Sequence, residues 1–210
     1  SSTVEMRRKL RDYISQDKLK ELHRLSPAKH YAVTAWQFLL LGSAITGAAL
    51  LDRWYFWLPC SVVAGFTIFN FTVMLHEVVH NAVHRGKGHI SGPLLGWLYA
   101  FPSGISRSQF TRWHLDHHSG LGTEDQDPKR HYLSPKRNAR WYKLLYMTPA
   151  LIVIYFRAAA RESKTYPAAL RRKIARERLV TVVGQLAILA SIAFFFGWWI
   201  YFAFVNGPWI

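Results

Sequence analysis

Three long stretches of the sequence carry no charged residue and no histidine: 31–51, 54–75 and 179–210. A helix needs about 20 predominantly apolar residues to cross the hydrocarbon core of a bilayer, and each stretch is long enough. Helices that are apolar on every side are typical of membrane spans. We therefore predict an all-α, multi-span integral membrane protein with spans at about 31–51, 54–75 and 179–205.

The basic residues are distributed so that they predict the topology of these spans. Eight of the 27 Lys and Arg residues precede residue 31, one (Arg53) separates the first two spans, and eighteen lie between 75 and 179. Since basic loops stay in the cytosol, we expect the N-terminus and the region 76–178 on the cytosolic side. Anionic lipid head groups then account for the net charge of +15, and no nucleic-acid partner is expected.

The region 76–178 contains two shorter apolar runs. The run at 90–104 is broken by Gly and Pro and is too short to cross a bilayer, so it predicts a re-entrant or interfacial segment. The run at 144–156 lies between basic residues and predicts a helix on the membrane surface. The single cysteine, Cys60, excludes an internal disulfide and a cysteine-based metal site.

The sequence HEVVH directly follows the second uncharged stretch and matches the zinc-binding pattern H-E-x-x-H. His76, His80 and His84 recur every four residues, so we expect them on one face of a helix that stops near Gly86. This face would lie at the cytosolic end of the span.

A second histidine pattern, HLDHH, contains His114, His117 and His118. Residues at i, i+3 and i+4 share one side of a helix, and neutral imidazoles bind zinc, iron, copper and nickel. A catalytic zinc ion uses three protein ligands, whereas the two patterns offer five histidines, or six with His84. The set suits two metal ions, and histidine ligands at a membrane surface point to iron and oxygen.

The order and spacing of these motifs resemble the histidine boxes of the membrane fatty acid desaturase and hydroxylase superfamily, with HEVVH as first box and HLDHH as second. The stretch around them is similar to sphingolipid delta-4 desaturases. That likeness includes Asn81, Leu115, Leu121, Gly122, Glu124 and Asp125. The superfamily has a third box, but the only histidine after residue 118 is His131, so we expect 1–210 to be a single incomplete domain, truncated before that box.

The resemblance implies a membrane-bound, oxygen-dependent lipid desaturase with two irons. It implies the metal ligands His76, His80, His114, His117 and His118, with His84 as a weaker candidate. Glu77 and Asp116 become candidates for carboxylates that orient the ligands, because metal-bound histidines usually donate their second N–H to such a group. The substrate would be a fatty acyl or sphingolipid chain, and electrons would come from a donor such as cytochrome b5 or ferredoxin.

Three alternatives stay open on the sequence. A lipid hydroxylase of the same superfamily would use the same metal site. A zinc metalloprotease would use HEVVH with Glu77 as base, but it needs a third ligand, usually an Asp in a later span, and 179–210 contains no acidic residue. A non-enzymatic membrane scaffold or metal carrier would also present a histidine-rich face.

Overall fold

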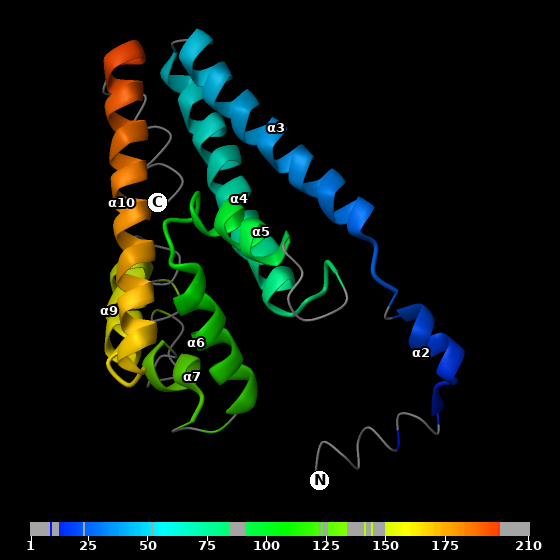
Figure 1. The fold of residues 1–210 in the computed structure, drawn as a ribbon. Coiled ribbons are helices and arrows are strands. Elements are labelled where there is room, and N and C mark those ends of the chain that lie inside the picture. The colour runs from blue at the N-terminus through cyan, green and yellow to red at the C-terminus, as the bar shows by residue number, and fades with distance from the viewer. Residues whose placement is uncertain are drawn as a thin grey trace.

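The computed structural model is helical wherever it has regular secondary structure in the described residues (Figure 1). The structure describes residues 9, 13–22, 24–51, 53–84, 91–121, 123, 126–133, 141, 144 and 150–197.

Among the residues that the structure describes, three helices are long and apolar enough to cross a membrane: α3 (Pro27–Leu51), α4 (Trp54–Val79) and α10 (Ala168–Phe196). They confirm the prediction of an all-α protein with three candidate spans. Each begins or ends beyond the uncharged stretch of the sequence, because charged residues at the end of a span continue the helix. The clearest case is α10, which includes the basic turns before residue 179.

Helices α3 and α4 form an antiparallel hairpin (Figure 1). Small residues on the facing sides, Ala44, Ala48 and Ala64, are buried together and let the two backbones approach closely. Ile192 of α10 packs against the same cluster. Large apolar side chains such as Phe66 and Phe69 remain exposed on α4, as expected for a helix surrounded by lipid.

The described residues after the hairpin include the shorter helices α5 (Ser91–Ala100), α6 (Arg107–Ser119), α7 (Pro128–Tyr132) and α9 (Ala150–Ser163). A seven-residue helix, α2 (Gln16–Leu22), precedes α3. At ten residues α5 is too short to cross a bilayer, and it packs against the end of α4 around Tyr99 and Phe71. The helix expected at 144–156 overlaps α9, with residues 145–149 outside the described part of the chain, and its place on the membrane surface stays a prediction.

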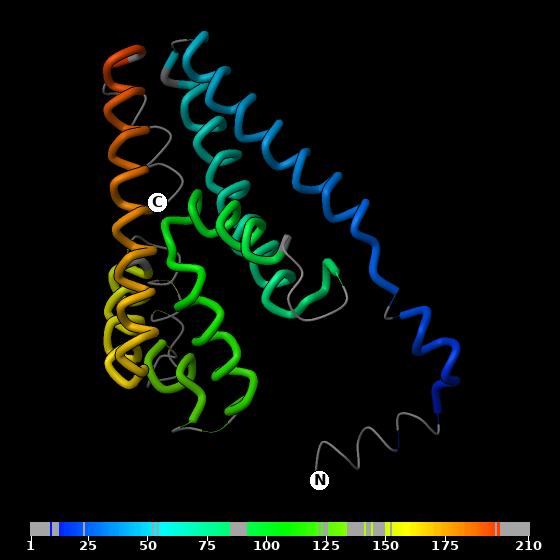
Figure 2. The backbone as a smooth tube through the Cα atoms, viewed as in Figure 1, coloured from blue at the N-terminus to red at the C-terminus, as the bar shows by residue number. Residues whose placement is uncertain are grey.

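Figure 2 shows α6 between the α3–α4 hairpin and α10. On one side Phe110 packs against the core formed by α4 and α5. On another side Trp113 is buried against Ala158 and Ala159 of α9. This position brings α6 beside the end of α4.

The expected helix through all three histidines of the first motif is wrong. Helix α4 ends at Val79, His80 caps it, and Asn81 takes a left-handed conformation with φ of 53°. Asparagine tolerates this conformation better than other non-glycine residues, so it turns the chain out of the helix. His84 therefore does not share a helix face with His76.

Candidate metal centre

Four histidines converge where the end of α4 meets α6. His76 lies in the last turn of α4 and His80 caps that helix, while His114 and His118 lie one turn apart on α6. One ring nitrogen from each of the four lies within 4.8 Å of the others. The Nε2 atom of His114 lies 2.7 Å from Nε2 of His80 and 2.9 Å from Nε2 of His118.

The electrostatics of the cluster favour neutral imidazoles. Burial, together with the nearby His76 and Lys129, lowers the pKa of His114 to about 3. Burial also lowers the pKa of His80, with His118 as the second cause. Unprotonated rings present lone pairs, which are what a transition metal requires.

The spacing of the cluster also fits a metal ion. Bonds from zinc to imidazole are about 2.0–2.1 Å, so ligands on opposite sides of one ion stand roughly 4 Å apart. The four ring nitrogens all lie within 4.8 Å of one another, which is close enough for one cation to bind several of them. The donor set therefore suits iron or zinc, and it does not distinguish between them.

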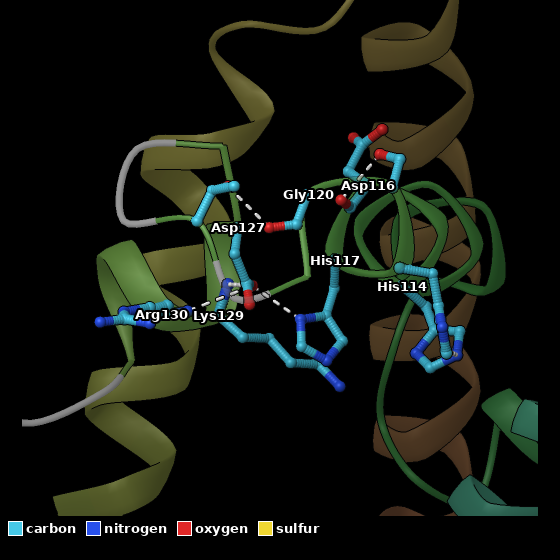
Figure 3. Close-up of polar contacts among 10 residues, drawn as sticks. His114, Asp116, His117, Gly120, Asp127, Lys129 and Arg130 are labelled. Atoms are coloured by element: carbon cyan, nitrogen blue, oxygen red, sulfur yellow. Dashed lines mark hydrogen bonds and ion pairs between the residues drawn. The ribbon is translucent and has the colours of Figure 1, made fainter. Parts of the chain in front are cut away.

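His117 belongs to the second motif but faces a different partner. Its Nδ1 atom lies 2.6 Å from Oδ1 of Asp127. Figure 3 shows the two side chains pointing toward each other. Asp127 is buried and caps α7, accepting hydrogen bonds from the backbone N–H groups of Lys129 and Arg130. Burial opposes ionisation of Asp127, but these hydrogen bonds outweigh it and lower its pKa.

An ionised Asp127 accepts a hydrogen bond from Nδ1–H of His117, and in the neutral imidazole this tautomer carries its lone pair on Nε2. This is the arrangement of a metal-binding histidine oriented by a carboxylate. His117 lies outside the group of four, with its ring centroid 6.3 Å from that of His114.

The remaining candidate residues lie away from the four converging nitrogens. Nε2 of His84 lies 2.9 Å from the hydroxyl of Tyr31. Glu77 Oε2 lies 2.7 Å from Nδ1 of His30 on α3, because the residue after His76 points to another side of the helix. Asp116 forms a 2.7 Å ion pair with Nε of Arg112, one turn earlier on α6. The structure thus gives both carboxylates partners other than the cluster.

Sequence reasoning missed the part played by His30. It is buried, and besides Glu77 it contacts the hydroxyl of Tyr99 at 2.8 Å. Thr34 also lies 2.7 Å from that hydroxyl, so the network joins α3, α4 and α5 next to the first motif. A histidine just before an apolar span gives no sign of such a partner, since the contact joins residues 47 positions apart.

Asp127 was also missed, although a signal for its local structure exists. An Asp followed by Pro is typical of a helix start, and α7 begins there. That pattern predicts the cap and not the contact with His117.

The fold and the histidine cluster define an integral membrane protein with four histidines that could hold a metal ion at the end of a candidate span. The family model for fatty acid desaturase matches residues 52–210, and the chain belongs to that family. The resemblance stated from the histidine boxes is thereby confirmed.

Among curated proteins, the chain is 28% identical to human sphingolipid delta(4)-desaturase/C4-monooxygenase DES2 over 182 residues, which is 82% of this chain and 53% of that protein. The chain thus spans about half the length of this relative. No solved structure matches this chain.

Proposed function

We propose that the chain is part of a membrane-bound lipid desaturase whose iron centre includes His76, His80, His114 and His118. The observation that supports this most is the convergence of four ring nitrogens from two motifs 34 residues apart, in a chain of the fatty acid desaturase family. Histidine ligands on two different helices form a site only when both helices are placed correctly, so chance convergence is a poor explanation.

His117 is proposed as a ligand of a second iron. Its Nδ1 is occupied by Asp127 and its Nε2 is left for a metal, which supports a second ion close to the first and distinct from it. Two histidine-bound irons would supply the activation of molecular oxygen needed to abstract hydrogen from an unactivated acyl chain.

The protein's own residues would orient the ligands and exclude water. Phe110 stacks on His114 with parallel rings whose centroids are 5.6 Å apart, and it joins the apolar core of α4 and α5. Asp127 holds one tautomer of His117. Because His76 is in the last turn of a candidate span, the site is within reach of an acyl chain held in the bilayer.

Hydroxylation is the second candidate reaction. The human relative is named both a desaturase and a C4-monooxygenase, so its two activities fit the same kind of site. We propose a sphingolipid or related acyl lipid as substrate on the same ground. The zinc-protease reading has lost support, because Glu77 pairs with His30 and the chain belongs to the desaturase family.

The proposed orientation places the N-terminus and the histidines in the cytosol, where an electron donor such as cytochrome b5 or ferredoxin would meet them. A reporter fused between Asp52 and Arg53 tests this orientation. We expect it to be labelled from outside the cell or from the lumen. Labelling from the cytosol would overturn the orientation and, with it, the proposal of a cytosolic electron donor.

The function is tested by expressing the full-length protein with an electron donor in cells that lack the corresponding activity. Lipid extracts are analysed for a mass loss of two hydrogens or a gain of one oxygen, and iron is counted per purified chain. We expect about two irons and an oxidised sphingolipid or acyl product, as the ligand count requires. Bound zinc without iron, or iron without any oxidised lipid, would reject the proposal.

A further inference from the structure

A buried carboxylate on α10 contacts the helix that carries the second histidine box. Glu177 is only 4% exposed and lies just before the uncharged part of α10. Its Oε2 accepts hydrogen bonds from the hydroxyl of Ser106 at 2.6 Å and from the backbone N–H of Ser108 at 2.8 Å. Its Oε1 accepts a hydrogen bond from the hydroxyl of Ser108 at 2.5 Å. A carboxylate in a protein interior is costly unless donors such as these satisfy its oxygens.

These contacts lie at the N-terminus of α6. Ser106 is the N-cap of that helix, and its hydroxyl also accepts a hydrogen bond from the N–H of Gln109. The first N–H groups of a helix have no partner inside it, and the positive end of the helix dipole favours an anion there. Glu177 meets both requirements from a helix 69 residues away in sequence.

Neighbouring contacts fix the same two segments in the same register. Arg178 donates a hydrogen bond to the side-chain oxygen of Gln109 at 2.6 Å, and Gln109 donates to the carbonyl of Ala159 on α9. Two turns further along α10, a Cβ on Gly184 would lie 2.6 Å from the Phe101 ring, so a larger residue there would force this ring to shift. The described part of α10 therefore contacts α6 and the segment before it at several positions along its length.

We propose that Glu177 is a positioning residue for the second histidine box, so that the third span sets where His114, His117 and His118 stand relative to α4. The inference rests on the proposed metal-dependent function. Ser108 and His114 are six positions apart on one short helix, about 9 Å along its axis. A slide of α6 would move all three histidines together, and ligand–metal distances in such sites stay within about 0.2 Å of their preferred values.

The test compares Glu177→Gln and Glu177→Ala with the wild type in the full-length protein. Each purified protein is stripped with a chelator and titrated with Co²⁺, whose visible absorption reports both affinity and ligand geometry. We expect both variants to bind Co²⁺ about 10–100-fold more weakly, as for other residues that orient metal ligands, and with shifted absorption bands.

Two controls separate positioning from general stability. Glu21→Gln removes an exposed carboxylate of α2 and should leave Co²⁺ binding unchanged. Gln37→Ala removes the contact between Gln37 and Asn70 in the α3–α4 hairpin, so it should lower the melting temperature without shifting the Co²⁺ bands.

The milder Ser108→Ala keeps the inference testable if Glu177→Ala fails to fold. We expect it to lower Co²⁺ affinity by about threefold, because it removes one hydrogen bond.

The outcomes separate this inference from the proposed function. If the wild type binds metal and the Glu177 variants match it in affinity and spectrum, the positioning role is rejected and the function stands. A double variant of Ser108→Ala and Glu177→Ala gives a second check. If its loss of Co²⁺ affinity equals the product of the two single losses, the two residues are not coupled and the positioning role is again rejected. If the wild type binds no metal, both ideas are rejected.

Discussion

The first histidine box lies at the end of the candidate membrane span α4, whereas the second lies on the thirteen-residue helix α6, which is too short to cross a membrane. His76 and His80 are placed by α4 itself, which packs along α3 in a long hairpin. His114 and His118 are placed by polar contacts from α9 and α10 at the start of α6.

The difference teaches where each box is vulnerable. A long apolar helix distributes its packing over many turns, so no single polar contact decides where its end lies. A short helix has few packing contacts of its own, and most helix stability in proteins comes from tertiary packing. We therefore expect the second box to depend on residues distant in the sequence and the first box to depend on them much less.

Removing a histidine of the cluster should have the largest effect. We expect His114→Ala to weaken iron binding more than about 100-fold and to abolish lipid oxidation, since losing only an orienting partner costs about 10–100-fold. Iron content after dialysis and product formation measure this. His84→Ala is the matched control, because His84 contacts Tyr31 and stands outside the cluster. Equal loss in both variants would contradict the cluster as the metal site.

Much of this architecture could be predicted from the sequence, and the reason lies in its periodicities. Apolar length predicts the spans, and the i, i+4 spacing predicts that His114 and His118 face one way. The helix end at Val79 could not be predicted, because it depends on the left-handed turn at Asn81. Local patterns also give no sign of His30 beside Glu77, since the two meet only when α3 packs on α4.

The second box contains the sharper example. The sequence pattern gives no reason to distinguish the three histidines of this box, yet His117 contacts Asp127 while His114 and His118 belong to the cluster. Ten positions separate Asp127 from His117, and the contact forms only because the chain turns back after α6. Helical spacing describes a face of one helix and carries no information about what packs against it.

Removing the partner of His117 should have the next largest effect. We expect Asp127→Asn to lower the affinity for one of two irons by about 10–100-fold, because the amide no longer favours the tautomer that leaves Nε2 free. Iron titration should show one tight and one weakened site. Asp17→Asn, at an exposed carboxylate of α2, serves as the charge-matched control. Two unchanged sites would remove His117 from the proposed ligands.

Breaking the polar network beside the first box should have a smaller effect on metal binding. His30→Ala leaves Tyr99 with one hydrogen-bond partner fewer in a buried position, so we expect a loss of about 1–3 kcal/mol in stability. Iron affinity should fall by less than about threefold, since α4 still places His76 and His80. A melting curve and an iron titration measure the two effects. A loss of affinity as large as that expected for Glu177→Ala would remove the contrast between the boxes.

The smallest effect is expected at Asp116, inside the second box itself. Its carboxylate pairs with Arg112, whose side chain is 51% exposed, and a helix pair of this kind contributes about 0.2–0.5 kcal/mol. Asp116→Asn should therefore change iron affinity and product formation by less than about twofold. Arg112→Gln breaks the same pair from the other side and should give the same result. A tenfold loss of iron in Asp116→Asn alone would return Asp116 to the role of orienting a ligand. Proximity in sequence would then matter more for this box than contacts from distant helices.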